Sequence, residues 1–97
     1  MAGCALTDLI VVGSKPAGDG RFGQSDLAGN VHEWALDFGN LYVNPCTDCA
    51  SLAGGETRIT RGGNFHFTSD QARTGVRGGF PPQQRFPEVG ARCARPL

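Results

Sequence analysis

The chain has 97 residues and a mass of 10.2 kDa, which is enough for one small domain. Nine Lys and Arg balance nine Asp and Glu, and this net charge of zero argues against nucleic acid or an anionic membrane as the main partner. The longest apolar run, residues 9–12, is far shorter than the ~18–20 residues of a membrane-spanning helix. Fifteen Gly and six Pro indicate a turn-rich chain with a small core.

The charges are unevenly distributed along the sequence. Residues 1–56 carry two basic and seven acidic side chains, whereas residues 57–97 carry seven arginines and two acidic side chains. We expect the two halves to pack together and neutralise each other, although the acidic half also suits a bound cation.

The hydrophobic pattern predicts short strands and no long amphipathic helix. In chain order, the predicted strands cover residues 9–12, 31–38, 58–61, 65–67 and 89–94. Alternation within residues 31–38 places bulky apolar side chains on one face and carboxylates on the other. The apolar face carries Trp34, Leu36 and Phe38, and the acidic face carries Glu33 and Asp37.

The connecting segments are rich in turn residues. Gly39 to Gly55 contains two Asn, a Pro and a Cys-x-x-Cys sequence, which predicts an irregular loop held by its cysteines. A short helical turn with Ser69 as its cap is weakly indicated over residues 69–73. The two Arg-Gly-Gly sequences are too few for an RNA-binding segment in a neutral chain, so glycine-interrupted strands are the favoured interpretation.

The four cysteines favour structural disulfides and, through them, an extracytoplasmic location, although no signal peptide is evident. They are Cys4, Cys46, Cys49 and Cys93, and their three possible pairings stay open. Zinc is a weaker alternative because no second Cys-x-x-Cys or close Cys/His pair is present. A thioredoxin-like role is weaker still, since Asn44-Pro45 rather than a strand precedes the Cys-x-x-Cys.

The most informative stretch is residues 23–34. Asp26, a Gly29-Asn30 turn and Glu33 supply hard oxygen atoms within eight residues, and Ca²⁺ accepts six to eight such ligands without strict geometry. In the alternative interpretation, Asp26 caps a turn and Glu33 pairs with an arginine of the C-terminal half. The spacing leaves both open.

Residues 26–34, Asp-Leu-Ala-Gly-Asn-Val-His-Glu-Trp, resemble the DxxGNVWEW signature of the formylglycine-generating enzyme family, also called the sulfatase-modifying factor family. Residues 12–23 resemble the stretch before that signature, residues 61–65 its RGGS(W/F) element and residues 89–94 its terminal GFRCA element. The resemblance extends from Val12 to Arg95. It implies an α+β, C-type-lectin-like fold with short strands, long loops and little regular structure.

The family domain is more than twice as long, so residues 1–97 correspond to its C-terminal part. We therefore expect either a truncated domain or a partner that supplies the N-terminal half. The resemblance also implies that the cysteine at the Cys93 position pairs upstream of this chain, so that Cys93 is unpaired or joins Cys4.

The resemblance assigns roles to individual residues. It places a calcium site on the side chains of Asp26 and Glu33 and the carbonyl oxygens of Gly29 and Val31. The family's other calcium site should be absent, because Cys4 stands at its one remaining position.

The family's enzymes oxidise a substrate cysteine to formylglycine with copper held by two cysteines. Those two positions are Phe67 and Ala72 here, and neither side chain binds Cu(I), so copper is not expected. Two other active-site positions also differ, with His32 in place of Trp and Asn64 in place of Ser. We expect His32 to be a packed residue rather than a metal ligand or an acid–base group.

Three functional hypotheses follow from the resemblance. The leading one is a catalytically inactive, calcium-binding domain that holds a peptide or another ligand in the remaining groove. The second is an active oxidase of protein cysteine, or of a related substrate, that is completed by an N-terminal partner. The third is a folded fragment without retained activity.

Overall fold

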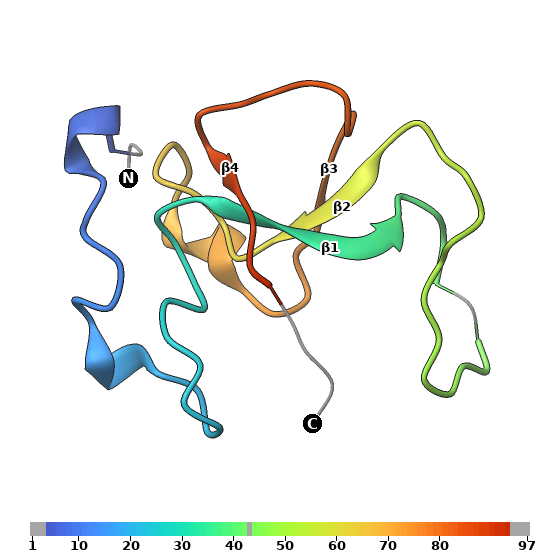
Figure 1. Ribbon diagram of the computed structural model, residues 1–97, viewed down its shortest axis with the longest axis horizontal. Helices are drawn as coiled ribbons and strands as arrows, with labels where there is room; N and C mark the ends of the chain where they lie inside the picture. Colours follow the sequence, from blue (N-terminus) through green and yellow to red (C-terminus); the bar gives the residue numbers. More distant parts are fainter. Residues whose placement is uncertain (1–3, 43, 94–97) are drawn as a thin grey trace.

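The computed structural model describes residues 4–42 and 44–93. A mixed four-stranded sheet with the order β3-β2-β1-β4 forms its centre (Figure 1). The strands are β1 (His32–Phe38), β2 (Arg58–Arg61), β3 (Gly78–Phe80) and β4 (Val89–Gly90). β1 pairs antiparallel with β2 and parallel with β4, and β2 pairs antiparallel with β3.

Helical structure in the described residues is limited to three single 3₁₀ turns, η1 (Leu6–Asp8), η2 (Pro16–Gly18) and η3 (Ser69–Ala72). The helical part of the expected α+β fold is thus reduced to short turns. The predicted turn at residues 69–73 is present, although its cap residue is Thr68 rather than Ser69. No helix in this part of the chain is long and apolar enough to cross a membrane.

Three strand predictions differ from the structure. Residues 9–12 form no strand, and the side chains of Val11 and Val12 are 78% and 77% exposed. The backbone there bonds to a side chain instead, because the Asn30 amide joins both the N–H and the carbonyl of Ile10. Residues 65–67 form a turn, and the last strand covers only residues 89–90 of the predicted 89–94, of which residue 94 lies outside the described residues.

Each face of the sheet has a distinct character. Across β1 and β2, Trp34 pairs with Thr60 and Glu33 pairs with Arg61, so each pair shares one face. The predicted separation of Trp34 from Glu33 is therefore correct. Leu36 is nevertheless 63% exposed, and it lies where the register between β1 and β2 shifts, between residues 34 and 38.

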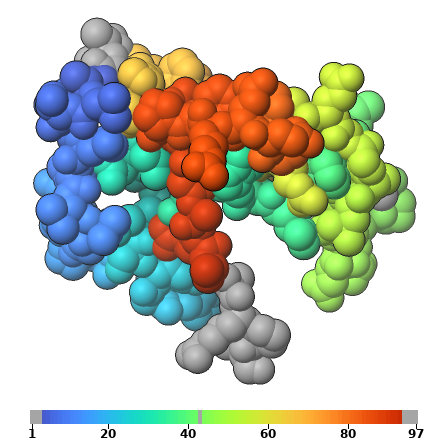
Figure 2. Space-filling view, turned by 45° about the horizontal axis from the view of Figure 1, so that its top comes forward, coloured from blue at the N-terminus to red at the C-terminus, as the bar shows by residue number. Residues whose placement is uncertain are grey.

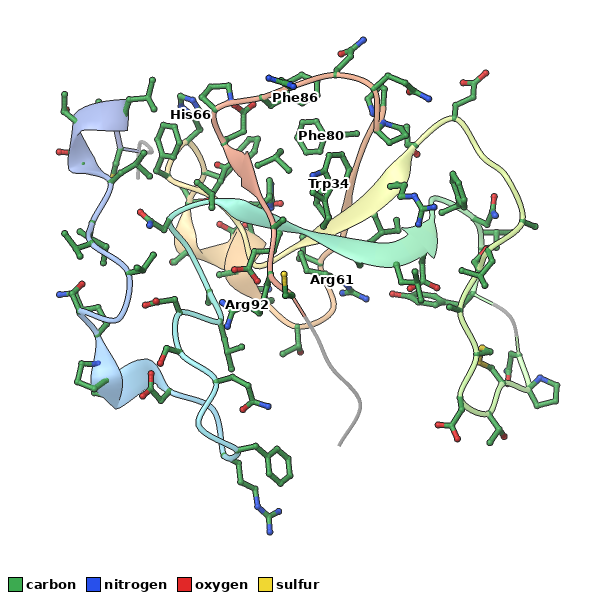
Figure 3. The ribbon with its side chains drawn as sticks, in the orientation of Figure 1. Trp34, Arg61, His66, Phe80, Phe86 and Arg92 are labelled. Carbon is green, nitrogen blue, oxygen red and sulfur yellow. A yellow bond between two sulfur atoms is a disulfide. The ribbon has the colours of Figure 1, made fainter. Side chains whose placement is uncertain are left out.

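An aromatic cluster covers the Trp34 face. The Trp34 and Phe80 ring centroids are 6.4 Å apart in an edge-on arrangement, and those of Phe80 and Phe86 are 4.7 Å apart. Figure 3 shows these three rings on one side of the sheet, with Arg61 and Arg92 on the other. The apolar interior is small, since only Ile59 and Phe65 are buried hydrophobic residues in the described part of the chain.

Long segments flank the sheet on two sides. Residues 4–30 run along one side, and the loop between β1 and β2, described for residues 39–42 and 44–57, projects from the other (Figure 1). The connection between β3 and β4 lies over the strands, and the 39–57 loop forms a separate projection (Figure 2). Gly63, with φ of 70°, brings β2 against η3, because an added Cβ would lie 3.2 Å from the Ala72 nitrogen.

Candidate functional site

A cleft of about 440 Å³ lies beyond the end of β2, between the N-terminal segment and η3. The turn of residues 63–65 and η3 supply one wall, and residues 4–10 and 28–30 supply the other. A hydrogen bond of 3.0 Å from the Phe65 N–H to the Asn30 carbonyl joins the two walls. The resemblance places four positions of the family's active site in this chain. Three of them, Asn64, Phe67 and Ala72, line this cleft.

Asn64 is the buried polar residue of the cleft, with only 6% of its surface exposed. Its Oδ1 accepts the His66 N–H at 2.9 Å, which fixes the orientation of the amide because a backbone N–H requires an acceptor. Its Nδ2 has no hydrogen-bond partner among the described residues. Asn64 therefore keeps an unpartnered donor that is buried beneath the cleft surface.

Phe67 and Ala72 make the cleft largely apolar. Phe67 is 54% exposed, so its ring is accessible to a ligand. Ala72 is held close to Gly63 by the tight approach of η3 described above. Neither side chain carries a group that transfers protons or binds a metal ion.

His32, the fourth expected position, does not line the cleft but packs beside it. Its ring centroid lies 6.2 Å from that of Phe67 and 5.9 Å from that of Phe80, and the residue is 6% exposed. Burial lowers the pKa of His32 below its ordinary value of 6.5, while a hydrogen bond with the Arg61 backbone and the charge of Glu88 act in the opposite direction. Its Nδ1 has no partner in the described part of the chain.

Cys4 also lines the cleft, a position that the sequence does not predict. Its backbone N–H donates to the Phe65 carbonyl at 2.5 Å, and the residue lines the cleft with a free thiol. No sequence signal could have located it, because about sixty residues separate it from Asn64. Among the described residues, no second cysteine lines this cleft.

The residues expected to bind calcium lie in the loop before β1 and in β1 itself. Both Glu33 carboxylate oxygens accept hydrogen bonds from Arg92, each at 2.8 Å. The Arg92 guanidinium also donates to the Ser25 and Asp26 carbonyls at 2.5 and 2.9 Å. Asp26 directs Oδ2 to the Gly13 N–H at 2.6 Å.

The Glu33–Arg92 contact matches one part of the alternative interpretation, in which Glu33 pairs with a C-terminal arginine. The other part, a turn capped by Asp26, differs from the structure, where Asp26 bonds to the Gly13 N–H thirteen positions away. The Glu33–Arg92 ion pair also joins the acidic half of the chain to the basic half, as the charge distribution predicts. The hydrogen bond with Glu33 raises the pKa of Arg92. Among the described residues no group of three His, Cys, Asp or Glu side chains comes together.

The oxygen donors of this loop suit calcium in kind, because Ca²⁺ prefers carboxylates and backbone carbonyls. Their availability is restricted, since Arg92 already contacts both Glu33 oxygens. A calcium ion would therefore have to exchange with the Arg92 guanidinium at Glu33.

The cysteines divide into one bonded pair and two thiols. Cys46 and Cys49 form a disulfide with a Cα–Cα distance of 5.8 Å in the loop between β1 and β2, as expected for structural cysteines. Cys4 and Cys93 are free and exposed. Of the two outcomes that the resemblance allowed for Cys93, the structure shows the unpaired one.

A small domain with few strands and little helix, and with the signature loop leading into β1, has the fold of the sulfatase-modifying factor type, which is C-type-lectin-like. The sequence profile of the sulfatase-modifying factor enzyme 1-like domain matches residues 6–97. The chain therefore belongs to this family. No curated protein matches the chain.

A solved structure shares this fold. "Treponema denticola variable protein 1" superimposes with a TM-score of 0.71 and is 29% identical in sequence over 82% of this chain. The match covers 29% of that protein, so this chain spans less than a third of its length.

Proposed function

We propose that this chain is a catalytically inactive member of its family that binds a peptide in the cleft at Asn64 and Phe67. The observation that carries this proposal is the Asn64 Nδ2 donor, which is buried in the cleft wall and has no partner among the described residues. A buried donor without a partner costs about 1–3 kcal/mol. Nδ2 is buried in the unliganded chain, so a ligand that presents a carbonyl oxygen to Asn64 recovers this free energy when the cleft wall opens to expose it.

The remaining cleft surface suits a peptide that carries an apolar side chain. Phe65, Phe67, Ile10 and Ala72 supply apolar surface, and the exposed Phe67 ring can pack against a ligand side chain. A peptide backbone supplies the acceptor for Asn64, and an adjacent side chain supplies the apolar contact. One ligand class thus satisfies both features of the cleft.

The proposal that the chain is catalytically inactive depends on which side chains in the cleft could bind copper. Cu(I) is held by soft thiolates, and Phe67 and Ala72 stand at the two positions where the family resemblance expects them. The disulfide-bonded Cys46 and Cys49 line a different cavity. Cys4 supplies one thiol to the cleft, which is insufficient for a site that needs two.

One observation favours a second candidate function. Because Cys4 lines the cleft, a partner that brought another thiol beside it would complete a pair of soft ligands. An oxidase assembled with the rest of the family domain is the alternative proposal. Formation of aldehyde only in the presence of that partner distinguishes it from the inactive binding domain.

Partner binding is also supported by exposed apolar side chains outside the cleft. Val11 and Val12, which are adjacent in the N-terminal segment, are 78% and 77% exposed. Adjacent exposed apolar side chains are the kind of surface that a contact with another protein segment covers. A polypeptide corresponding to the N-terminal part of the family domain is the proposed partner.

The peptide proposal is tested by selection from a library of random peptides displayed on phage, which is screened against the folded chain. Enriched peptides should bind the unmodified chain saturably in fluorescence anisotropy. Asn64→Ala and Phe67→Ala should each weaken binding at least about tenfold, since each loses about 1.4 kcal/mol or more.

Phe22→Ala is the matched control, because Phe22 is exposed and does not line the cleft. Failure to enrich any peptide, or enriched peptides that bind Asn64→Ala as well as the unmodified chain, would contradict the proposal. Circular dichroism of each variant excludes unfolding as the cause of lost binding.

We further propose that calcium binds at Asp26 and Glu33, with the carbonyls of Gly29 and Val31, in exchange for Arg92. The oxygen donor set supports this proposal, as do the left-handed backbone conformations of Asp26 and Gly29, with φ of 55° and 81°. Bound calcium would neutralise the two carboxylates and fix the loop that leads into β1.

Calcium that binds only the folded chain raises its stability by RT ln(1 + [L]/Kd). Thermal melts with calcium should therefore show a higher midpoint than melts with a chelator. The change Asp26→Asn with Glu33→Gln should abolish the difference, and Arg92→Gln should enlarge it by removing the competing cation. Coincident melts of the unmodified chain would reject the calcium proposal.

A further inference from the structure

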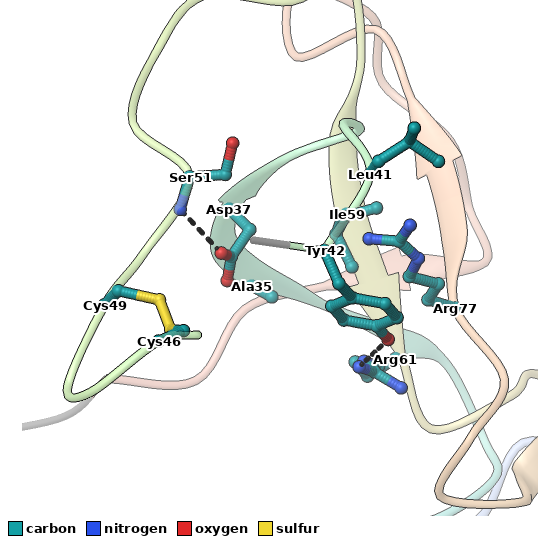
Figure 4. Close-up of a pocket in the computed structure, with 10 residues that line it drawn as sticks. All are labelled: Ala35, Asp37, Leu41, Tyr42, Cys46, Cys49, Ser51, Ile59, Arg61 and Arg77. Atoms are coloured by element: carbon teal, nitrogen blue, oxygen red, sulfur yellow. Dashed lines mark hydrogen bonds between the residues drawn. A yellow bond between two sulfur atoms is a disulfide. The ribbon is translucent and has the colours of Figure 1, made fainter. Parts of the chain in front are cut away.

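A second cavity, of about 230 Å³, lies on the Glu33 face of the sheet, away from the aromatic cluster (Figure 4). β1 and β2 form its floor, the loop with the Cys46–Cys49 disulfide forms one wall, and Arg77 closes the opposite side. Two arginines, one tyrosine and one aspartate converge on this small volume.

Arg61 is fixed in position by three hydrogen bonds. Its Nη1 donates to the Thr74 and Val76 carbonyls at 2.8 and 2.9 Å, and its Nη2 donates to the Tyr42 hydroxyl at 3.1 Å. A guanidinium has five N–H groups, so two remain for a ligand. The contacts are with neutral groups, and the positive charge of Arg61 has no carboxylate partner among the described residues.

Arg61 contacts the hydroxyl of Tyr42, and Arg77 stacks on the face of the Tyr42 ring. Its guanidinium carbon lies 4.1 Å from the Tyr42 ring centroid, in a cation–π contact. No hydrogen bond or ion pair from the Arg77 side chain is formed in the described part of the chain. Tyr42 therefore holds two cationic groups at one side of the cavity.

Asp37 provides the opposite charge. Its Oδ1 accepts the Ser51 N–H at 2.8 Å, which holds the carboxylate toward the disulfide loop. Figure 4 shows Asp37 and Ser51 on one side of the Tyr42 ring and the two arginines on the other. Asp37 Oδ2 has no partner in the described residues.

The floor between the charged groups is apolar. Ile59 is buried, with 6% of its surface exposed, and Ala35 lies beside it, while the exposed Leu41 stands at the rim of the cavity. A ligand that matches this surface carries an anionic group, a cationic group and an apolar portion. The volume limits it to a small molecule, because it lies below the ~300 Å³ of ordinary ligand clefts.

We propose that this cavity binds a small zwitterion of the α-amino acid class with an apolar side chain. The ligand carboxylate accepts hydrogen bonds from Arg61 and Arg77. The ammonium group donates to Asp37, and the side chain packs on Ile59. This site is separate from the Asn64 cleft, and the proposal does not depend on the peptide proposal.

The test is a titration followed by ¹H–¹⁵N correlation spectra of the whole chain, with L-leucine as the probe. Saturable shifts should centre on Tyr42, Ile59 and Arg61. Two analogues separate the charge contributions: 4-methylpentanoate lacks the amino group, and 3-methylbutylamine lacks the carboxylate. Each should bind at least about tenfold more weakly than leucine, because each loses a charge-assisted contact.

Variants distinguish binding in this cavity from a general effect of the chain's charge on leucine. Arg77→Gln and Asp37→Asn should each reduce leucine affinity at least about tenfold. Arg85→Gln is the matched control, because Arg85 is exposed and does not line the cavity. The same spectra show whether each variant is folded.

Several results would overturn the proposal. One is the absence of saturable shifts with leucine, and another is equal binding of leucine and the two analogues. A third is inorganic phosphate that produces the same shifts with higher affinity, which would indicate a site for anions alone. Unchanged affinity in a folded Arg77→Gln variant would also reject it.

Discussion

Arg92 and Glu33, which lie 59 positions apart, are joined by two hydrogen bonds of 2.8 Å. The same guanidinium reaches the carbonyls of Ser25 and Asp26. One side chain thus connects the segment after β4, the central strand β1 and the signature loop. The link is partly shielded, since the two side chains are 35% and 29% exposed.

Replacing Arg92 by Gln should therefore destabilise the fold. The change removes charge-assisted hydrogen bonds and leaves the Glu33 carboxylate unpaired, but partial exposure reduces the loss to about 1 kcal/mol. Chemical unfolding in urea at neutral pH measures the effect. Arg85→Gln serves as the control, and an equal midpoint in the two variants would contradict the structural role of Arg92.

Stability should fall in mild acid because of His32. Burial keeps the pKa of His32 below 6.5 in the folded chain, so the unfolded chain takes up a proton more readily. The contribution of neutral His32 is complete above about pH 6.5 and is lost as the pH falls through the lower folded-state pKa.

Urea unfolding between about pH 7.5 and about pH 5 measures this dependence. His32→Phe preserves the aromatic packing and should flatten the curve in this range. His66→Gln is the control, because His66 is exposed. A curve that is unchanged by His32→Phe would show that other groups carry the pH dependence.

Protein made in an oxidising compartment should contain two free thiols before reduction and four after it. The structure assigns the bonded pair to Cys46 and Cys49 and the free thiols to Cys4 and Cys93. Mass spectrometry after alkylation counts and locates them. Modification at Cys46 before reduction, or a Cys4–Cys93 bond, would refute the assignment.

The change Cys46→Ser with Cys49→Ser should have a limited effect on stability. The cysteines are separated by three positions, and a loop this short contributes only about 1.5–2 kcal/mol in the chain-entropy model. Thermal melts should show a lowered midpoint with a cooperative transition retained. Loss of all cooperative unfolding would show that the loop determines the fold.

The isolated chain should produce no formylglycine when it is supplied with copper, oxygen and a sulfatase-type Cys-x-Pro-x-Arg peptide. Phe67 and Ala72 cannot bind Cu(I), and the single thiol of Cys4 provides only one ligand. Hydrazide labelling of the peptide detects the aldehyde. Labelling above a control with copper alone would favour the oxidase, and its loss in Cys4→Ser would identify the thiol responsible.

Local patterns predicted the central strands correctly. Alternation in residues 31–38 gave β1 within one residue, and the Arg58–Arg61 pattern gave β2. These predictions succeed because the side chains of β1 divide between two unlike faces. The apolar run of residues 9–12 predicted a strand that the structure does not contain. No strand lies beside this segment in the described part of the chain, and the backbone of Ile10 bonds to the Asn30 side chain instead.

Contacts between distant segments were beyond the reach of local patterns. β3 contains Gly78 and Gly79, which favour strand structure poorly by themselves. Their place in the sheet depends on packing, because an added Cβ would lie 2.8 Å from Thr60 Oγ1 at Gly78 and 3.1 Å from Thr57 Oγ1 at Gly79. The position of Cys4 in the same cleft as Asn64 also depends on packing between distant segments, so the sequence pattern does not predict it.

The pairing of β1 with β4 has a consequence for the speed of folding. The pair His32 with Val89 and the Arg92–Glu33 link both require closure of a loop of nearly sixty residues. The entropy of that closure is lost before the contacts it brings together are made. Chains dominated by such distant contacts fold in milliseconds to seconds, far more slowly than helical bundles. The hairpin of β1 and β2 can form early, and the sheet is completed only when β4 arrives.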